Sequence, residues 1–177
     1  MLLTACGSES TLLDRFWNGF MLEVQARLQF TTHCLGNVRC RKIDCFLKDP
    51  SEGRVMFLPT WWRALMNYSA KVLSKHHKLV KDIDWDPVID GTPSEYQRFY
   101  KPEVFQLHEA FFPGDVIGVN AVLPQGLTIT DFWQLLDVAG RYRGISPYRP
   151  EPKYGTFNVR DVRKRVRTHK KEETNTK

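Results

Sequence analysis

The most regular pattern in the chain is a strict alternation of apolar and polar residues between positions 22 and 30. Leu22, Val24, Ala26, Leu28 and Phe30 are apolar, and every residue between them is polar. Successive side chains of a strand point to opposite faces, so a period of two puts all five apolar side chains on one face. The pattern predicts a strand with one buried face and one face in water.

Several more segments have the composition of strands. Residues 42–58 contain two short apolar runs around a turn rich in Asp, Pro, Ser and Gly, which predicts a hairpin. Residues 104–112 and 116–123 are separated by Pro-Gly-Asp and predict a second hairpin. A last short strand is predicted at residues 156–162. The acidic segment 81–102 contains several prolines and a glycine, so we expect an irregular connection there.

Two segments have the periodicity of amphipathic helices. In residues 59–78 the apolar positions form one stripe, Pro59 stands near the start, and Lys and His residues occupy the last turn. A second stripe follows Thr128 or Thr130, either of which can cap the helix, and Gly140 is expected to end it.

The order of these elements predicts an α+β fold. If the first hairpin combines an insertion with a core strand, the chain reads β-α-β-β-α-β, the ferredoxin-like (RRM-like) arrangement of one sheet with two helices on one face. We expect a single domain over residues 20–162, an N-terminal extension (1–19) and a basic, disordered tail (163–177). The sheet face without helices would be free to carry a binding surface.

Composition indicates the class of protein and its compartment. The chain has 177 residues, of which 42% are hydrophobic and 26% charged, as in a soluble globular domain, and no apolar run is long enough to span a membrane. The absence of a secretory signal favours a reducing cytoplasm. The cysteines at positions 6, 34, 40 and 45 lack the close pairing of zinc ligands, so we expect free buried thiols and no metal or other cofactor.

Charge is unevenly distributed along the chain. The formal net charge is +6, but residues 141–171 alone contain eleven lysines and arginines against two acidic residues, so the rest of the chain is net negative. A concentrated positive excess is typical of proteins that bind polyanions, and a solvated basic tail gives the same count. For the tail alone both interpretations are open.

The segment between the second helix and the last strand combines three kinds of residue. Glycines allow close approach of a ligand to the backbone, and prolines stiffen the connection, which lowers the entropy cost of ordering it on a partner. Cations can neutralise phosphates, and tyrosines offer flat faces to unpaired bases, so the combination favours single-stranded nucleic acid over duplex. The residues concerned are the cations Arg141, Arg143, Arg149 and Lys153 and the aromatics Tyr142, Tyr148 and Tyr154.

Residues 137–159, DVAGRYRGISPYRPEPKYGTFNV, join a helix ending in glycine, a basic glycine-containing loop and a strand with an aromatic-Gly-x-aromatic pattern. This segment resembles the C-terminal signature of the RAMP superfamily, the ferredoxin-like RNA-binding proteins of CRISPR effector complexes. Residues 20–36 resemble the first strand of that fold, and residues 54–73 resemble its second strand and first helix. The chain also resembles small uncharacterised phage-encoded proteins that end in a comparable run, which implies a bacterial or phage-infected host cell.

The resemblance implies that guide or target RNA lies along the loop. Ser146 stands where a second closely spaced glycine is often found, and prolines interrupt the loop. These departures favour contacts from side chains over close approach of the loop backbone. The matching positions are Gly144, Arg149, Tyr154 and Gly155, with Arg63 of the first helix nearby.

We therefore predict a non-catalytic protein that binds single-stranded RNA or DNA, RNA in particular, and that works with copies of itself or other subunits in a larger or filamentous nucleoprotein assembly. Two alternatives stay open. One is a metal-independent endoribonuclease using His76 or His77. The other is a module that docks on an acidic host partner through Trp61, Trp133 or Phe111. The predicted nucleic-acid-binding residues are Arg63, Arg141, Arg143, Gly144, Tyr148, Arg149, Lys153, Tyr154 and Gly155.

Overall fold

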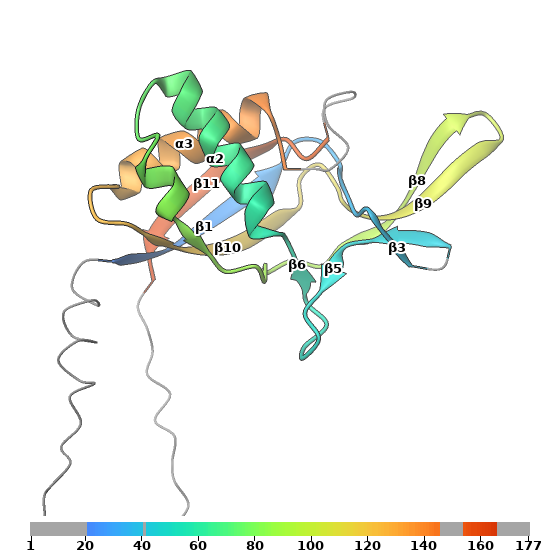
Figure 1. The fold of residues 1–177 in the computed structure, drawn as a ribbon. Helices are drawn as coiled ribbons and strands as arrows, with labels where there is room; N and C mark the ends of the chain where they lie inside the picture. The colour runs from blue at the N-terminus through green and yellow to red at the C-terminus, as the bar shows by residue number, and fades with distance from the viewer. Residues whose placement is uncertain (1–20, 41, 146–153, 166–177) are drawn as a thin grey trace, which may run out of the picture.

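The computed structural model describes residues 21–40, 42–145 and 154–165, and only the backbone of Tyr100. One part of it is a four-stranded antiparallel sheet covered on one face by helices α2 (Pro59–Leu73) and α3 (Ile129–Tyr142) (Figure 1). The predicted N-terminal extension lies outside the described residues. The strands of the sheet are, in spatial order, β11 (Phe157–Lys164), β1 (Leu22–Phe30), β10 (Val116–Leu123) and β7 (Asp84–Trp85).

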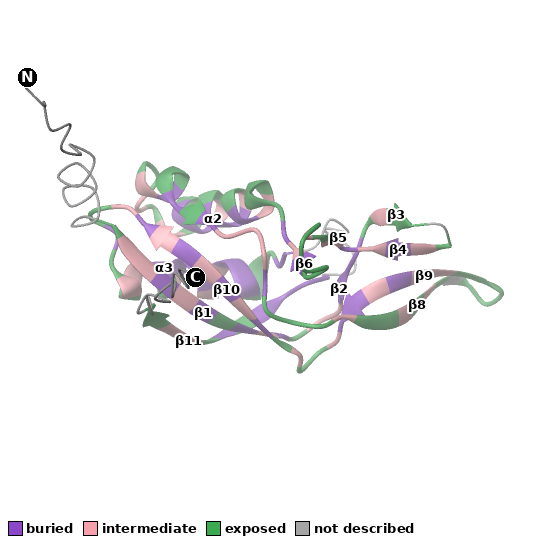
Figure 2. Cartoon of the chain, turned by 90° about the horizontal axis from the view of Figure 1, so that it is seen from below, coloured by how far each residue is buried: buried purple, intermediate pink, exposed green. Residues whose placement is uncertain are grey.

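The apolar residues of the predicted alternation form part of the core under the helices. Val24, Ala26, Leu28 and Phe30 each have at most 1% of their surface exposed and belong to the main apolar cluster, together with the stripes of both helices. Figure 2 shows the same change between buried and half-buried residues along β1 and β10. The predicted strand over residues 22–30 is confirmed. The last strand, β11, runs to Lys164 and so enters the predicted tail.

Both predicted helices are present, with differences at their ends. Thr128 caps α3 in a capping box: its Oγ1 accepts a hydrogen bond from Asp131 N (3.1 Å), and the Asp131 side chain accepts one from Thr128 N. α2 ends at Leu73, earlier than predicted, because Ser74 adopts a left-handed conformation with φ 54°. A short 3-10 helix, η1 (Leu79–Asp82), follows.

A second sheet extends away from the helices (Figure 1). It is centred on β9 (Val104–Phe111), which pairs with three other strands, one of them in parallel. The partners of β9 are β2 (Cys34–Leu35), β4 (Ile43–Cys45) and β8 (Ser94–Lys101), and β4 also pairs with β3 (Val38–Cys40). A separate hairpin of β5 (Leu47–Lys48) and β6 (Val55–Met56) lies within the hairpin region predicted from the sequence.

The predicted hairpin of residues 104–112 and 116–123 is wrong. β9 and β10 belong to different sheets, because β10 pairs with β1 and β7 while β9 pairs with β8, β4 and β2. The turn between them is bonded to β1 instead, with Gly114 N donating to Phe30 O at 2.8 Å. The segment 81–102 is also not irregular throughout, since it contains β7 and β8. The core strand predicted within the first hairpin is also wrong, because β5 and β6 pair with each other in a separate sheet. The second strand of the helix-covered sheet along the chain is β7.

Candidate nucleic-acid interface

Gly140 does not end α3, contrary to the sequence prediction. The helix continues to Tyr142, and Gly140 is buried in its last turn. A Cβ atom on Gly140 would lie only 2.3 Å from Phe157 O, so the glycine is required where α3 packs against β11. The left-handed residue that follows the helix is Gly144 (φ 73°), whose N–H donates to Ala139 O at 2.9 Å.

Gly144, Ile145, Tyr154 and Gly155 form a tight pair of backbone segments, which we call the neck. Ile145 N donates to Gly155 O at 2.8 Å. Gly144 and Gly155 both have positive φ, 73° and 70°, and a Cβ on either would lie within 2.8 Å of the facing backbone. The neck thus needs both glycines for its own geometry, and both are buried.

The neck is fixed to the segment that follows β1. Gly155 N donates to His33 O at 2.7 Å, and Thr31 N donates to Thr156 O at 2.8 Å. The Thr156 hydroxyl lies 2.7 Å from the hydroxyls of both Thr31 and Thr32. These contacts join the C-terminal side of the neck to the point where the chain leaves the first sheet for the second.

The described cations of the predicted site lie on the outer side of the helices. Arg63 is exposed on α2, and Arg141 is exposed on α3 with its Nε 2.9 Å from Asp137 Oδ1. Arg143 is also exposed, and its guanidinium lies over the Tyr68 ring, 5.2 Å from the centroid. It borders a shallow groove that we call the helix groove, lined by Ala64, Asn67, Tyr68, Lys71, Val72 and Arg143.

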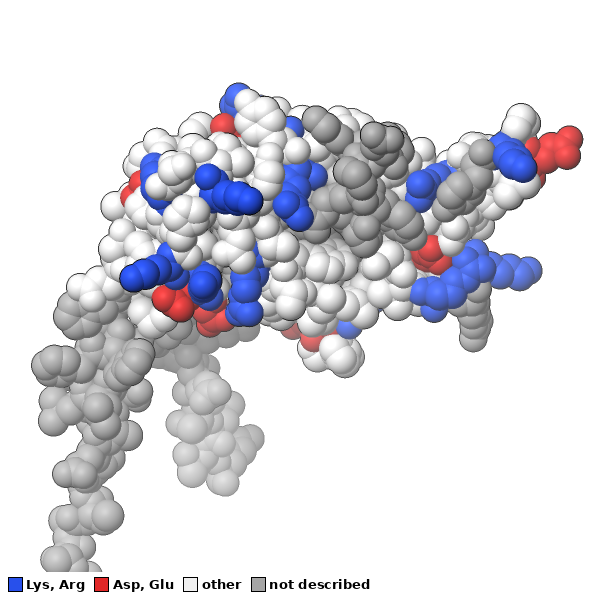
Figure 3. Space-filling model, turned by 45° about the horizontal axis from the view of Figure 1, so that its top comes forward, with Lys and Arg blue, Asp and Glu red and all other residues white. Residues whose placement is uncertain are grey.

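Lys71 is a cation of this surface that the sequence prediction did not include. It lies two turns after Arg63 on α2, about 12 Å along the helix axis, and it shares the helix groove with Arg143. Figure 3 shows Lys and Arg side chains gathered over the two helices. The period of α2 alone identifies Lys71 as exposed, but only the packing of α3 against α2 shows that it lies beside Arg143.

Tyr154 is not an open stacking face. Its ring is only 8% exposed and packs in a small cluster with Leu35 and Ala110. The guanidinium of Arg98 lies 5.2 Å from the centre of the ring. Of the other predicted aromatic residues, Tyr142 is 61% exposed at the end of α3. Three predicted residues, Tyr148, Arg149 and Lys153, lie outside the described residues.

Three partly exposed rings lie next to the neck. His33 packs on Tyr96 with ring centroids 4.4 Å apart and an interplanar angle of 32°, and it meets Phe112 edge to face at 5.0 Å. Tyr96 and Phe112 also touch, with centroids 5.9 Å apart. Burial of the His33 imidazole lowers its pKa below the usual 6.5, so this ring is neutral at neutral pH.

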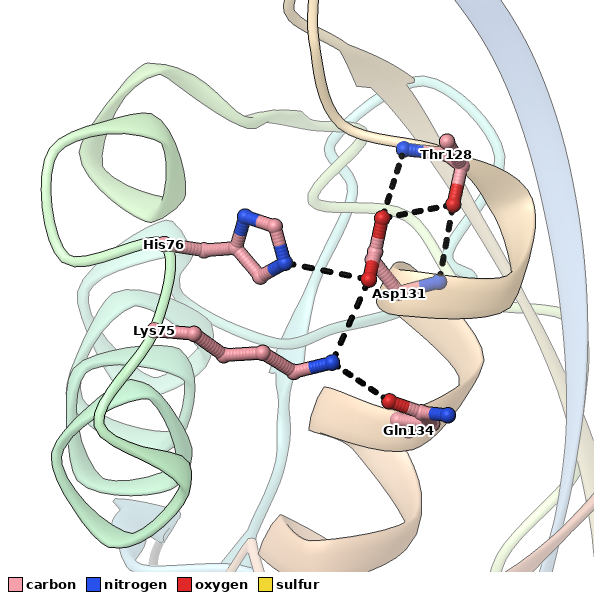
Figure 4. A network of polar contacts seen from close by, with 5 residues as sticks. All are labelled: Lys75, His76, Thr128, Asp131 and Gln134. Atoms are coloured by element: carbon pink, nitrogen blue, oxygen red, sulfur yellow. Dashed lines mark hydrogen bonds and ion pairs between the residues drawn. The ribbon is translucent and has the colours of Figure 1, made fainter.

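His76 lies beside Asp131 at the start of α3 (Figure 4), whereas the neck follows the end of that helix. Its Nε2 is 3.0 Å from Asp131 Oδ1, and Lys75 Nζ is 3.2 Å from the same oxygen. The hydroxyl of Thr128, followed by Lys75 and His76, holds the pKa of the Asp131 carboxyl at about 2. Asp131 and Gly144, where the neck begins, are about 20 Å apart along the axis of α3. His76 therefore joins the two helices and is not brought to the neck; His77 is exposed in the same turn.

The predicted docking anchors are only partly available. Phe111 is 1% exposed and belongs to the main core, so it cannot anchor a partner. Trp133 is 38% exposed on α3, and Trp61 is half-buried against the core.

The described residues bring together no group of three or more His, Cys, Asp or Glu side chains that could hold a metal ion. Of the described thiols, Cys34 is buried as expected, whereas Cys40 is exposed. None of the helices in the described part of the chain is both long enough and apolar enough to cross a membrane.

No protein-family model matches the chain, and no curated protein matches it significantly. Among solved structures, it is similar to a chain in the cryo-EM structure of the Type III-B Cmr-beta bound to cognate target RNA. The two chains share 9% sequence identity and align with a TM-score of 0.55 over 89% of this chain and 68% of the other. At that identity the likeness concerns the fold alone: the chain has a mixed α+β fold similar to that of a Cmr-beta chain and consistent with the ferredoxin-like, RAMP-type fold predicted from its sequence.

Proposed function

We propose that this protein is a non-catalytic binder of single-stranded nucleic acid, with RNA preferred, and that the strand lies across the outer side of α2 and the end of α3, next to the neck. The observation that carries the proposal is a set of three exposed cations, Arg63, Lys71 and Arg143. No other described residue forms an ion pair with any of the three. They are therefore available to phosphates.

The neck adds a reason for this location. It begins directly after Arg143, and it joins the ends of a segment whose sequence contains Arg149 and Lys153. That segment therefore starts and ends at the neck, directly after Arg143. We include Arg149, Lys153 and Tyr148 in the proposed site on their chemistry and on the sequence resemblance.

The order of the elements supports a RAMP-type ferredoxin-like assignment. Along the chain, the helix-covered sheet and its helices follow one another as β1, α2, β7, β10, α3 and β11, and the spatial strand order is β11-β1-β10-β7. We assign this sheet and its two helices as the β-α-β-β-α-β unit, with the second sheet inserted into it. The similar Cmr-beta chain comes from a structure with bound target RNA, which supports RNA as the ligand and an assembly of several chains as the context.

The proposal is tested by titrating labelled single-stranded RNA, single-stranded DNA and duplex DNA of equal length with nuclease-treated protein. Fluorescence anisotropy at several salt concentrations gives the affinity and its salt slope. We expect preference for single strands, and a decrease of about 0.7 in log affinity per tenfold rise in salt for each phosphate contact. Preference for duplex, or no binding at low salt, would contradict the proposal.

Substitutions locate the surface. Arg63→Ala, Lys71→Ala and Arg143→Gln should each weaken binding and reduce the salt slope by about the contribution of one phosphate contact. Lys101→Ala is the matched control, because Lys101 is an exposed cation at the end of β8 in the second sheet, which extends away from the helices. A triple variant that binds with wild-type affinity and slope would exclude this surface.

A further inference from the structure

The three rings beside the neck come from segments far apart in the sequence. His33 follows β1, Tyr96 belongs to β8, and Phe112 begins the turn after β9. One strand of the second sheet and two connections between the sheets thus each place one ring at the same point. Because the backbone of His33 is bonded to Gly155, this point is fixed relative to the neck.

These rings differ from the aromatic residues of the core. Phe30, Phe46 and Phe57 have at most 2% of their surface exposed, whereas His33, Tyr96 and Phe112 each keep part of their surface in solvent. Tyr96 and Phe112 pack with one side against the small cluster of Leu35, Ala110 and Tyr154, and the part of each ring that stays in solvent is available to a partner.

The charges around the rings suit a nucleotide. Arg98 lies two positions after Tyr96 on β8, so both side chains project from the same face of the second sheet. Its guanidinium lies over the ring of Tyr154, at the neck. The His33 imidazole is neutral at neutral pH, so it presents a flat, uncharged ring.

We propose that His33 and Tyr96, supported by Phe112, form a stacking site for one unpaired nucleobase of the single strand whose phosphates bind the helix groove. This inference rests on the proposed function. It assigns base stacking to residues outside the loop, whereas Tyr154, the loop aromatic that the structure describes, is buried. Stacking on a protein ring is sequence-tolerant, so the site would accept any of the four bases.

The site is tested by photocrosslinking. A single-stranded RNA carrying 5-iodouracil is bound to the full-length protein and irradiated with long-wavelength ultraviolet light, which joins iodouracil preferentially to an aromatic ring stacked on it. Mass spectrometry of the digested complex then identifies the crosslinked residue. We expect a crosslink on His33 or Tyr96.

Affinity measurements on variants complete the test. His33→Ala should weaken single-strand binding about tenfold, in line with the loss of one stacked base, and His33→Phe should restore binding because it keeps a ring at this position. His77→Ala, an exposed histidine at the far end of the helices, is the control and should bind as wild type. The rescue by His33→Phe separates loss of stacking from loss of fold.

The outcomes separate this inference from the proposed function. If the wild-type protein binds the strand but crosslinks only elsewhere, and His33→Ala binds as tightly as wild type, the stacking site is refuted while the proposed function stands. If the wild-type protein binds no single strand at low salt, the proposed function fails and the stacking site fails with it.

Discussion

Replacing Asp131 with Asn should destabilise the fold by an amount that depends on pH. The carboxylate accepts hydrogen bonds from the Thr128 hydroxyl (2.6 Å) and Lys75 (3.2 Å) and lies 3.0 Å from His76 Nε2. These contacts lower the Asp131 pKa from 3.8 to about 2, which corresponds to at most about 2.5 kcal/mol of folding free energy. The side chain is 22% exposed, so water screens its ion pairs. We therefore expect Asp131→Asn to lower the free energy of unfolding by about 1–2 kcal/mol at neutral pH.

The sign of the pH dependence follows from the direction of this pKa change. A carboxyl whose pKa is lower in the folded state stabilises the fold above its unfolded-state pKa, and the contribution is lost as the pH falls through the folded-state value. Urea unfolding of the wild type and of Asp131→Asn at several pH values measures the contribution of the Asp131 carboxylate to stability. The difference in unfolding free energy should have its full value above about pH 5 and should shrink steadily below about pH 4.

Asp137→Asn provides the matched control on the same helix. Asp137 makes an i,i+4 ion pair with exposed Arg141 at 2.9 Å, and such pairs on a helix contribute about 0.3–0.5 kcal/mol. We expect this substitution to change the free energy of unfolding by less than about 0.5 kcal/mol. Equal effects of the two substitutions at neutral pH, or an Asp131→Asn deficit that is undiminished near pH 3, would refute the reasoning.

Four further substitutions test the backbone. Gly144→Ala should lower the free energy of unfolding by about 2 kcal/mol or more, because φ is 73° and the new Cβ would lie 2.6 Å from backbone. Gly53→Ala is the control, because φ is similar (67°) but no atom lies within 4 Å of the new Cβ. It should lower the free energy of unfolding by about 1 kcal/mol in the same urea assay. Gly140→Ala should lower the midpoint of thermal unfolding, although alanine favours helices, and an unchanged midpoint would contradict the packing of α3 on β11. Ser74→Gly should raise the free energy of unfolding by about 1 kcal/mol by relieving a left-handed residue, and the absence of any gain would count against strain there.

Local periodicity predicted the elements whose formation depends on residues close in the sequence. The alternation of β1, the stripes of α2 and α3 and the Thr128 cap are all decided by neighbours within one or two turns of chain. Strand pairing is not decided locally. Composition predicted strands at residues 104–112 and 116–123, but both strands pair with other strands. A two-residue strand such as β7 is too short to have a period.

The same distinction applies to the candidate site. Charge along the chain indicated the basic region, because the charge of a segment follows from its composition and does not depend on the fold. Burial of Tyr154 depends on Leu35 and Ala110, and the ring contact of His33 depends on Tyr96, all distant in sequence. A histidine directly after a predicted strand was visible in the sequence, but nothing local distinguished its ring from an ordinary surface residue.

The two glycines of the neck show why exposed side chains, and not the glycines, must carry the functional tests. Gly144 and Gly155 matched a nucleic-acid-binding pattern, yet the facing backbones alone already exclude a Cβ at both positions. A glycine variant that loses RNA binding would therefore report a distorted neck, whether or not RNA ever touches it. Arg63 and Lys71 on α2 can be replaced without entering the neck, so a change in their salt slope reports contact with the strand itself.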